Sequence, residues 1–203
     1  MTVIQKYGAW VLLLFHVIGL VLFQIDPSNA ELSYLTLYLC AIVLFLAESN
    51  VFRAIIPLLV IFVGGYVVEF IGVSTGILFG NYHYGSALGY KFLSIPIVIG
   101  MNWFAIVVSS ASIARRITRR ISIQILLTAL LCTLMDFLIE PVAMKYDFWQ
   151  WQNDIVPVQN YIAWFIFSLV FAAVYLLSSK TRNKPGEILW ILWIPFFILL
   201  NWL

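Results

Sequence analysis

Residues 121–144 read ISIQILLTALLCTLMDFLIEPVAM, an almost unbroken apolar run that carries two acidic residues near its end. The run is long enough to cross a bilayer, because a membrane-spanning helix needs about 20 predominantly apolar residues. It does not alternate between polar and apolar positions, as the strands of a membrane β-barrel do. This stretch therefore predicts a transmembrane helix with carboxyl groups inside it.

Similar apolar runs fill most of the remaining chain. Of 203 residues, 64% are apolar and 10% are charged, whereas globular chains are about 25% charged. This composition excludes a soluble domain, a disordered chain and a nucleic-acid binder. No connection is long enough for a soluble catalytic domain. We predict an all-α, polytopic transmembrane bundle of about seven spans, forming a single membrane domain over 1–203 and lying at 7–24, 32–49, 53–72, 92–114, 121–144, 160–180 and 187–203.

The basic residues predict the orientation of the bundle. Seven crossings place Lys91 and Lys145 on one side, and the other nine of the eleven Lys and Arg residues on the opposite side. Basic residues favour the cytoplasmic side, so the N-terminus is expected in the cytoplasm. The first span also resembles a signal peptide with a cleavage site at 28–30. We expect it to stay uncleaved, because the run is long and contains His16, but cleavage remains the alternative.

Three carboxyl groups lie within apolar stretches: Glu69, Asp136 and Glu140. A charge at mid-membrane costs about 2.5–3.5 kcal/mol on insertion scales, so such residues usually face the bundle interior and mark a function. Asp136 and Glu140 are four residues apart and share a helix face. Pro141 predicts a helix break beside them, of the kind that lines a cavity. The alternative is that Glu69 and Glu140 are interfacial residues that reach water.

Two other polar residues within the apolar runs carry weaker signals. Glu48 is expected at the cytoplasmic edge, in a surface pair with Arg53, and His16 is alone on the first span. Cys40 and Cys132 are expected to be buried core thiols. The chain has no phosphate loop, dinucleotide fingerprint or metal-ligand spacing, so no cofactor and no metal are predicted.

The two long outer connections, 73–91 and 145–159, are rich in glycine and aromatic residues. Aromatic side chains there form either an interfacial belt or a pocket wall whose π faces stabilise a cation. The repeated glycines favour tight turns or close approach to a ligand. Asn102 has an alternative role in a helix–helix hydrogen bond, and Asn160 as a helix N-cap. The predicted pocket-lining residues are Tyr82, His83, Asn102, Trp151, Asn160 and Trp164.

These residue types suit one kind of acid catalysis. A carboxyl group removed from water favours its neutral form, which can donate a proton. A second carboxylate and aromatic faces would stabilise the cation formed by protonating an electron-rich alkene. A membrane site fits a polyisoprenoid, since a carotenoid is about as long as the hydrocarbon core is thick, ~30 Å. Proton-coupled transporters use the same residue types, so a transporter or a non-enzymatic carrier remains an alternative.

Three motifs carry a resemblance to a known family. They are EFIGVSTGILFGNYHY at 69–84, DFLIEPVA at 136–143 followed by WQW at 149–151, and VPVQNYIAW at 156–164. Together they resemble the signatures of the carotenoid-biosynthesis membrane proteins of bacteria and archaea, which include the CruF-type carotenoid hydratases. The resemblance covers roughly 60–180.

The resemblance implies an enzyme that hydrates the terminal double bond of an acyclic ψ end group to a tertiary alcohol, without a redox cofactor. It implies a carotenoid substrate, other carotenoid-biosynthesis enzymes as partners, and a place in the cell (inner) membrane of a prokaryote. A related end-group cyclase or isomerase is the nearest alternative. The resemblance assigns no residue roles. On the physical argument, Asp136 is expected to donate the proton, and Glu69 and Glu140 to tune it or to orient water.

Overall fold

The computed structural model describes residues 3–180 and 182–203. Within them, seven helical segments are long and apolar enough to cross a membrane, so the predicted all-α polytopic bundle is confirmed. The segments are α1 (Val3–Ile25), the short helix η1 (Pro27–Leu32) with α2 (Ser33–Leu46), α3 (Val51–Thr75), α4 (Val98–Ile117), α5 (Ile121–Lys145), α6 (Val158–Ser178) and α7 (Lys184–Trp202).

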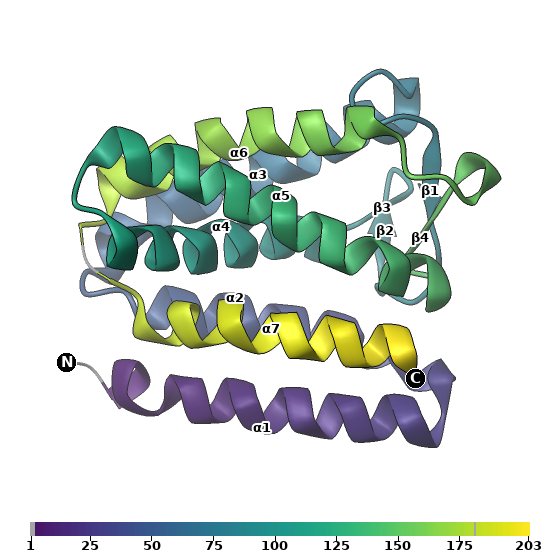
Figure 1. The fold of residues 1–203 in the computed structure, drawn as a ribbon, viewed down its shortest axis with the longest axis horizontal. Helices are drawn as coiled ribbons and strands as arrows, with labels where there is room; N and C mark the ends of the chain where they lie inside the picture. The colour runs from purple at the N-terminus through teal and green to yellow at the C-terminus, as the bar shows by residue number, and fades with distance from the viewer. Residues whose placement is uncertain (1–2, 181) are drawn as a thin grey trace.

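Helix α4 is the centre of the bundle. In its most apolar window 83% of the residues are buried, against at most 39% in the other spans. It packs against α2, α3, α5, α6 and α7. Figure 1 shows it between α3, α5 and α6 on one side and α2 and α7 on the other, with α1 outermost. Small residues, among them Gly100, Ala105 and Ser109, let the neighbouring helices approach closely.

Two predictions about helix bounds are wrong. The span expected from residue 92 begins at Val98, because β2 (Lys91–Phe92) and β3 (Ile95–Pro96) pair as a short hairpin before it. Helix α5 continues through Pro141 to Lys145, so no break occurs beside Glu140. Pro141 removes only one backbone donor near the helix end, and the residues that follow it, Val142 and Ala143, are fully buried.

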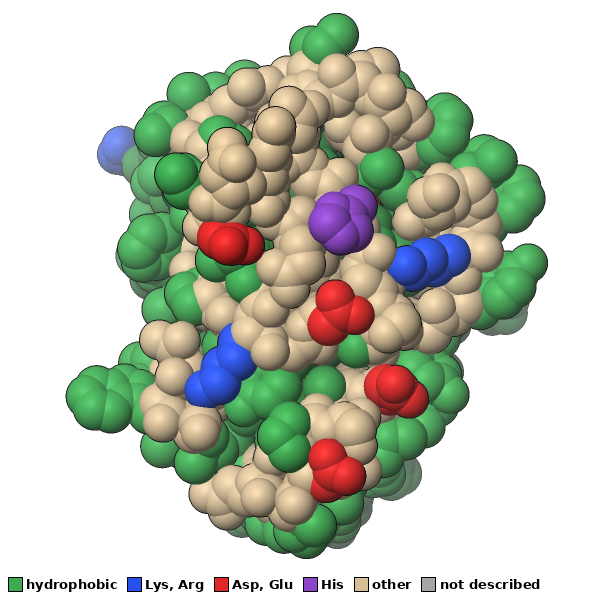
Figure 2. All heavy atoms as spheres, turned by 90° about the vertical axis from the view of Figure 1, so that its right-hand side faces the viewer, with side chains coloured by type: hydrophobic (Ala, Val, Ile, Leu, Met, Phe, Trp, Pro, Cys, Tyr) green, Lys and Arg blue, Asp and Glu red, His purple; other side chains and the backbone are tan. Residues whose placement is uncertain are grey.

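A β-ribbon covers one end of the bundle. Strand β1 (Tyr82–Tyr84) pairs antiparallel with β4 (Trp149–Trp151), which the helical turn η2 (Gln152–Asp154) follows. The ribbon and the hairpin both lie at the right-hand end in Figure 1, near the C-terminus. Figure 2 looks onto this end and shows acidic, basic and histidine side chains scattered among backbone and uncharged side chains, with most of the apolar side chains towards the rim. The connections 73–91 and 145–159 are thus ordered as a lid over the helix ends.

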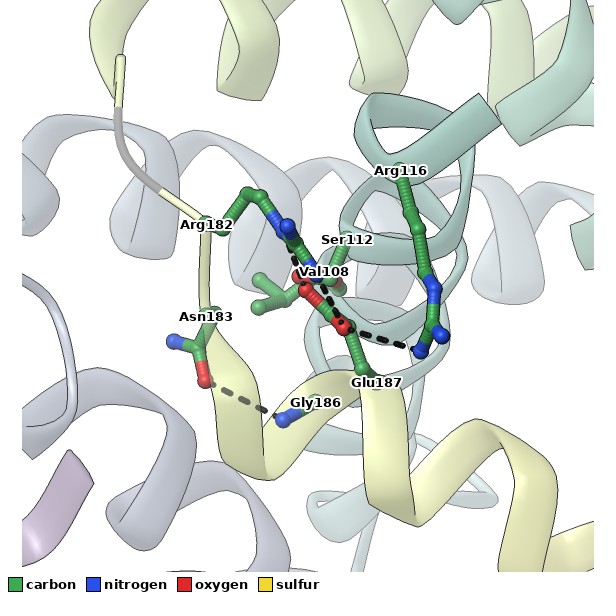
Figure 3. Close-up of polar contacts among 7 residues, drawn as sticks. All are labelled: Val108, Ser112, Arg116, Arg182, Asn183, Gly186 and Glu187. Atoms are coloured by element: carbon green, nitrogen blue, oxygen red, sulfur yellow. Dashed lines mark hydrogen bonds and ion pairs between the residues drawn. The ribbon is translucent and has the colours of Figure 1, made fainter. Parts of the chain in front are cut away.

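The opposite end of the bundle has its own polar contacts. The Glu187 carboxylate of α7 accepts two hydrogen bonds from the Arg182 guanidinium, at 2.6 and 2.7 Å, and lies 3.7 Å from Arg116 (Figure 3). Asn183 caps the helix by accepting from the Gly186 amide. These contacts join the start of α7 to the end of α4.

Glu48 is not paired with Arg53 at the surface, so that prediction is wrong. Its carboxylate is buried and accepts hydrogen bonds from Tyr175 at 2.6 Å, Ser179 at 2.7 Å and Asn183 at 2.9 Å. These donors come from α6 and the segment before α7, so Glu48 fixes the end of α2 against them. The prediction for the two cysteines is confirmed: both are buried free thiols.

Candidate functional site

The three predicted carboxyl groups line one small cavity under the β-ribbon. Glu69 comes from α3, and Asp136 and Glu140 come from α5; they are 5%, 1% and 2% exposed. Glu69 and Glu140 are therefore not interfacial residues reaching water. The cavity measures about 20 Å³, which is room for one water molecule.

Glu69 is held by three neutral donors. Its Oε2 accepts hydrogen bonds from the Tyr82 and Tyr84 hydroxyls, at 2.5 and 2.7 Å, and its Oε1 accepts from the Trp103 indole at 3.0 Å. Gly65, one turn earlier on α3, makes room for this indole, since a Cβ there would lie 2.7 Å from the Trp103 ring. The glycine and the carboxylate on one helix face therefore position the same tryptophan.

Glu140 is held in the same manner. Its Oε2 accepts from the Trp149 and Trp151 indoles, at 2.9 and 2.7 Å, and its Oε1 accepts from the Asn160 amide at 3.2 Å. Each glutamate thus receives two aromatic donors, two residues apart, from the strand that follows its own helix. The antiparallel pairing of Tyr82 with Trp151 and of Tyr84 with Trp149 brings the two sets together.

Strand alternation decides which ribbon side chains reach the acids. Tyr82 and Tyr84 point inward, and burial raises the pKa of both phenols well above the ordinary tyrosine value, with the Glu69 charge raising it further. Both tyrosines therefore remain hydrogen-bond donors at physiological pH. His83, between them, is exposed, pairs with Gln150 and does not line the cavity. The expectation that His83 lines the pocket is wrong, because successive strand residues face opposite sides.

Asp136 differs from the two glutamates. The Asn160 amide donates to its Oδ2 at 2.7 Å, and this is its one hydrogen bond within the described chain. Asn160 bridges Asp136 and Glu140, so it is not simply a helix N-cap; Pro157 occupies that position. One acid with one donor thus lies beside two acids with three donors each.

The remaining predicted residues complete the cavity wall. Trp164 stacks on Trp103 with ring centroids 3.8 Å apart and planes at 13°. Asn102 lines the cavity, is 8% exposed and makes no hydrogen bond to the described part of the chain, so the alternative of a helix–helix bond does not apply. Ile99 and Phe79 supply apolar wall. No Lys or Arg is among the lining residues.

Three donors were not among the predicted site residues: Tyr84, Trp149 and Trp103. For the first two a signal exists, because each lies two positions from a predicted residue, the spacing that puts strand residues on one face. Nothing in the sequence connects Trp103 to Glu69. Within residues 3–180 and 182–203, no group of three His, Cys, Asp or Glu side chains is arranged to hold a metal ion.

The fold and the site define a polytopic helical membrane protein with a buried, water-sized carboxyl cluster beneath an aromatic lid. The chain belongs to the carotenoid biosynthesis protein family, whose sequence model matches residues 8–202. It is 28% identical over 131 residues to a bisanhydrobacterioruberin hydratase of Haloarcula japonica; the match covers 61% of this chain and 45% of that protein. No solved structure matches the chain.

Proposed function

We propose that this protein hydrates the terminal carbon–carbon double bond of an acyclic ψ end group on a carotenoid, giving a tertiary alcohol. Membership of the family and the similarity to a bisanhydrobacterioruberin hydratase support this substrate class. The observation that carries the reaction type is the unequal number of hydrogen bonds to the three acids: Asp136 accepts one, whereas Glu69 and Glu140 accept three each, around a cavity with room for one water. A prokaryotic cell membrane is the proposed location.

The hydrogen bonds suggest a role for each acid. Glu69 and Glu140 accept three hydrogen bonds each, which favours the ionised form of a carboxyl group. Asp136 accepts one and has two carboxylates as neighbours, which favours its neutral form. Asp136 is therefore the proposed proton donor, and the two glutamates supply negative charge.

The proposed reaction balances without a cofactor. Asp136 gives its proton to the less substituted alkene carbon, which leaves a tertiary carbocation. The water in the cavity attacks the cation through oxygen, and Glu140 takes the proton that this water loses. That proton passes from Glu140 to Asp136, which lines the same cavity, through the next water that enters it, and this restores the acid for another turnover. The net change is one alkene and one water converted to one tertiary alcohol.

The carbocation would be stabilised by its surroundings. Trp164, whose far face stacks on Trp103, and the Tyr82–Trp151 pair, with ring centroids 4.8 Å apart, line the cavity. A cation over an aromatic face gains about 0.5–2 kcal/mol. The aromatic lid also excludes bulk water, so the single enclosed water is the nucleophile.

The origin of the oxygen atom tests this proposal. Membranes containing the protein are incubated without O₂ in ¹⁸O-labelled water with a carotenoid that has an acyclic end group. We expect a tertiary alcohol that carries the heavy oxygen, with no added cofactor. An unlabelled alcohol, or a requirement for O₂ or a reductant, would contradict hydration. A cyclic product without added oxygen would instead identify the related cyclase, and an unchanged pigment a carrier.

A further inference from the structure

A second, larger cavity adjoins the acid site. It measures about 210 Å³ and lies among α1, α2, α4, α5 and α7. Three residues line both this cavity and the acid cavity: Ile99, Asn102 and Trp149. The two spaces are therefore neighbours separated by one layer of side chains.

The wall of the larger cavity is mostly apolar, and the hydrogen-bonding groups of His16, one of its polar residues, already have partners within the protein. His16 Nδ1 contacts the Leu12 carbonyl at 2.7 Å, and the Trp193 indole donates to His16 Nε2 at 3.0 Å. A histidine that donates from one ring nitrogen and accepts at the other is neutral. The cavity thus offers an uncharged surface that suits a hydrocarbon rather than an ion.

The cavity reaches the lipid-facing surface between α1 and α2. Phe15 and Ile18 of α1, with Leu32 of η1 and Leu35 of α2, line the cavity and are 42% to 52% exposed. A hydrocarbon chain longer than the cavity can therefore extend from it into the bilayer.

Asn102 marks the crossing between the two cavities. Its amide is nine-tenths buried and has no hydrogen-bond partner in the described chain. A buried polar group left unpaired costs about 1–3 kcal/mol. An amide at this position therefore indicates a polar ligand at the junction, such as a water molecule or a hydroxyl.

We propose that the larger cavity is the channel for the hydrocarbon chain of a polyisoprenoid, which enters from the bilayer between α1 and α2 and places its end group at Asn102, against the cavity of the three acids. The Asn102 amide binds the water or the new hydroxyl at this crossing. The proposal rests on the proposed function for the identity of the chain, and it adds where the chain lies.

Gly19 of α1 offers a matched pair of variants. It lines the channel, and a Cβ there would lie 3.8 Å from the nearest neighbour, a carbon of the Phe196 ring. Gly19→Ala is therefore accommodated without a clash, whereas Gly19→Phe places a ring in the channel. Thr36→Phe, from the facing helix α2, blocks it from the other wall, with Thr36→Val as its control. None of these positions lines the acid cavity.

Two readouts separate the channel from the reaction. Protein purified in detergent from a carotenoid-producing host is assayed for retained pigment, by absorbance per protein, and for alcohol formed. We expect Gly19→Phe and Thr36→Phe to lose at least about tenfold in retained pigment, equivalent to ~1.4 kcal/mol of affinity. Gly19→Ala and Thr36→Val should retain wild-type amounts. Asp136→Asn should retain pigment without converting it.

Each outcome bears on one proposal. Wild-type pigment retention and turnover in folded Gly19→Phe and Thr36→Phe proteins would overturn the channel and leave hydration standing. Loss of pigment in both, with no alcohol formed by the wild type, would support the channel and reject hydration. Phospholipid found in the wild type and released by both variants, with carotenoid retention unchanged, would identify a structural lipid and overturn the channel. Thermal unfolding of each variant establishes that it is folded.

Discussion

Replacing Asp136 by asparagine removes the proposed proton without removing the local shape. The side-chain carbonyl oxygen of the introduced asparagine can still accept the hydrogen bond that Asn160 donates at 2.7 Å. An amide cannot protonate an alkene. General acid catalysis typically contributes 10²–10⁴-fold, so we expect Asp136→Asn to lower turnover by at least about 10²-fold.

The stability of the same variant reports the charge of Asp136 in the resting protein. If Asp136 is neutral, the exchange preserves the Asn160 contact, and the free energy of unfolding should change by less than about 1 kcal/mol, the typical net value of one hydrogen bond. If Asp136 were ionised, removing a charge from the membrane interior would stabilise the protein by about 2.5–3.5 kcal/mol. The site geometry favours the first result.

Two companion variants make the assay specific. Asp136→Glu keeps an acid and should retain part of the activity, limited by the extra methylene in a cavity of about 20 Å³. Glu140→Gln makes the same exchange of an acid for an amide, but it removes the negative charge proposed for Glu140 and places a second donor opposite the Asn160 amide, at 3.2 Å. It should therefore destabilise the protein by about 1–3 kcal/mol.

The measurements are pigment conversion in membranes, normalised to protein amount, and thermal unfolding in detergent. Turnover of Asp136→Asn within tenfold of the wild type, at equal protein levels, would remove Asp136 from the mechanism. Equal loss of activity in Asp136→Asn and Asp136→Glu would show that shape, rather than the acid, matters at this position.

Three further predictions follow from other parts of the structure. Gly65→Ala should lower activity more than stability, because its Cβ would lie 2.7 Å from the Trp103 ring and displace the donor to the α3 carboxylate; near-wild-type turnover would contradict this. The two β1 tyrosines, whose pKa is raised by burial and by the neighbouring carboxylate, should stay protonated at about pH 11, one unit above the ordinary value of about 10. Replacing both tyrosines by phenylalanine should then leave the phenolate absorbance of the folded protein unchanged and lower that of the unfolded protein. A pKa that is raised in the folded protein makes the free energy of unfolding fall as the pH rises above about 10. The double variant should therefore lose less stability at alkaline pH than the wild type. Cysteines at Ser122 and Asn153, in a background without the two native cysteines, should react with an impermeant reagent from opposite sides of the membrane. Labelling of both from one side would reject the seven-span model.

The spans could be predicted from sequence because bilayer thickness fixes their length and their apolar character is continuous. The start of α4 could not, because it depends on a hairpin whose turn places Leu93 and Ser94 at positive φ, 47° and 69°. Non-glycine residues rarely adopt that conformation, so a leucine and a serine at these positions do not predict it. Helix ends near such turns are decided by tertiary contacts rather than by hydropathy.

The acids of the site could be predicted because a carboxyl group inside an apolar run carries a recognisable cost. Their donors could be predicted only in part. The alternation that directs Tyr82 and Tyr84 inward and His83 outward exists only because residues 82–84 pair with 149–151. That pairing joins two segments far apart in the chain, and each reads as a loop when taken alone. Local patterns therefore found the aromatic residues but could not orient them.

The hydrogen-bond donors around Glu69 and Glu140 share one property, which is that they carry no charge. Two phenols, three indoles and one amide hold the two carboxylates, and all are neutral. A lysine or arginine would bind a carboxylate more strongly. However, a fixed positive charge ~4 Å from a carbocation would oppose it by about 4 kcal/mol at the effective dielectric constant of a protein, about 20.

Neutral donors avoid that repulsion while still compensating for burial. Hydrogen bonds to a charged group contribute about 1.5–3 kcal/mol each, so three per glutamate offset much of the cost of removing a carboxylate from water. The cavity then keeps its negative charge and its aromatic faces for the reacting group. Under the proposed reaction, the fold thus stabilises its acids with the donors that least disfavour a cation, which explains why tryptophan and tyrosine stand where buried carboxylates usually meet arginine.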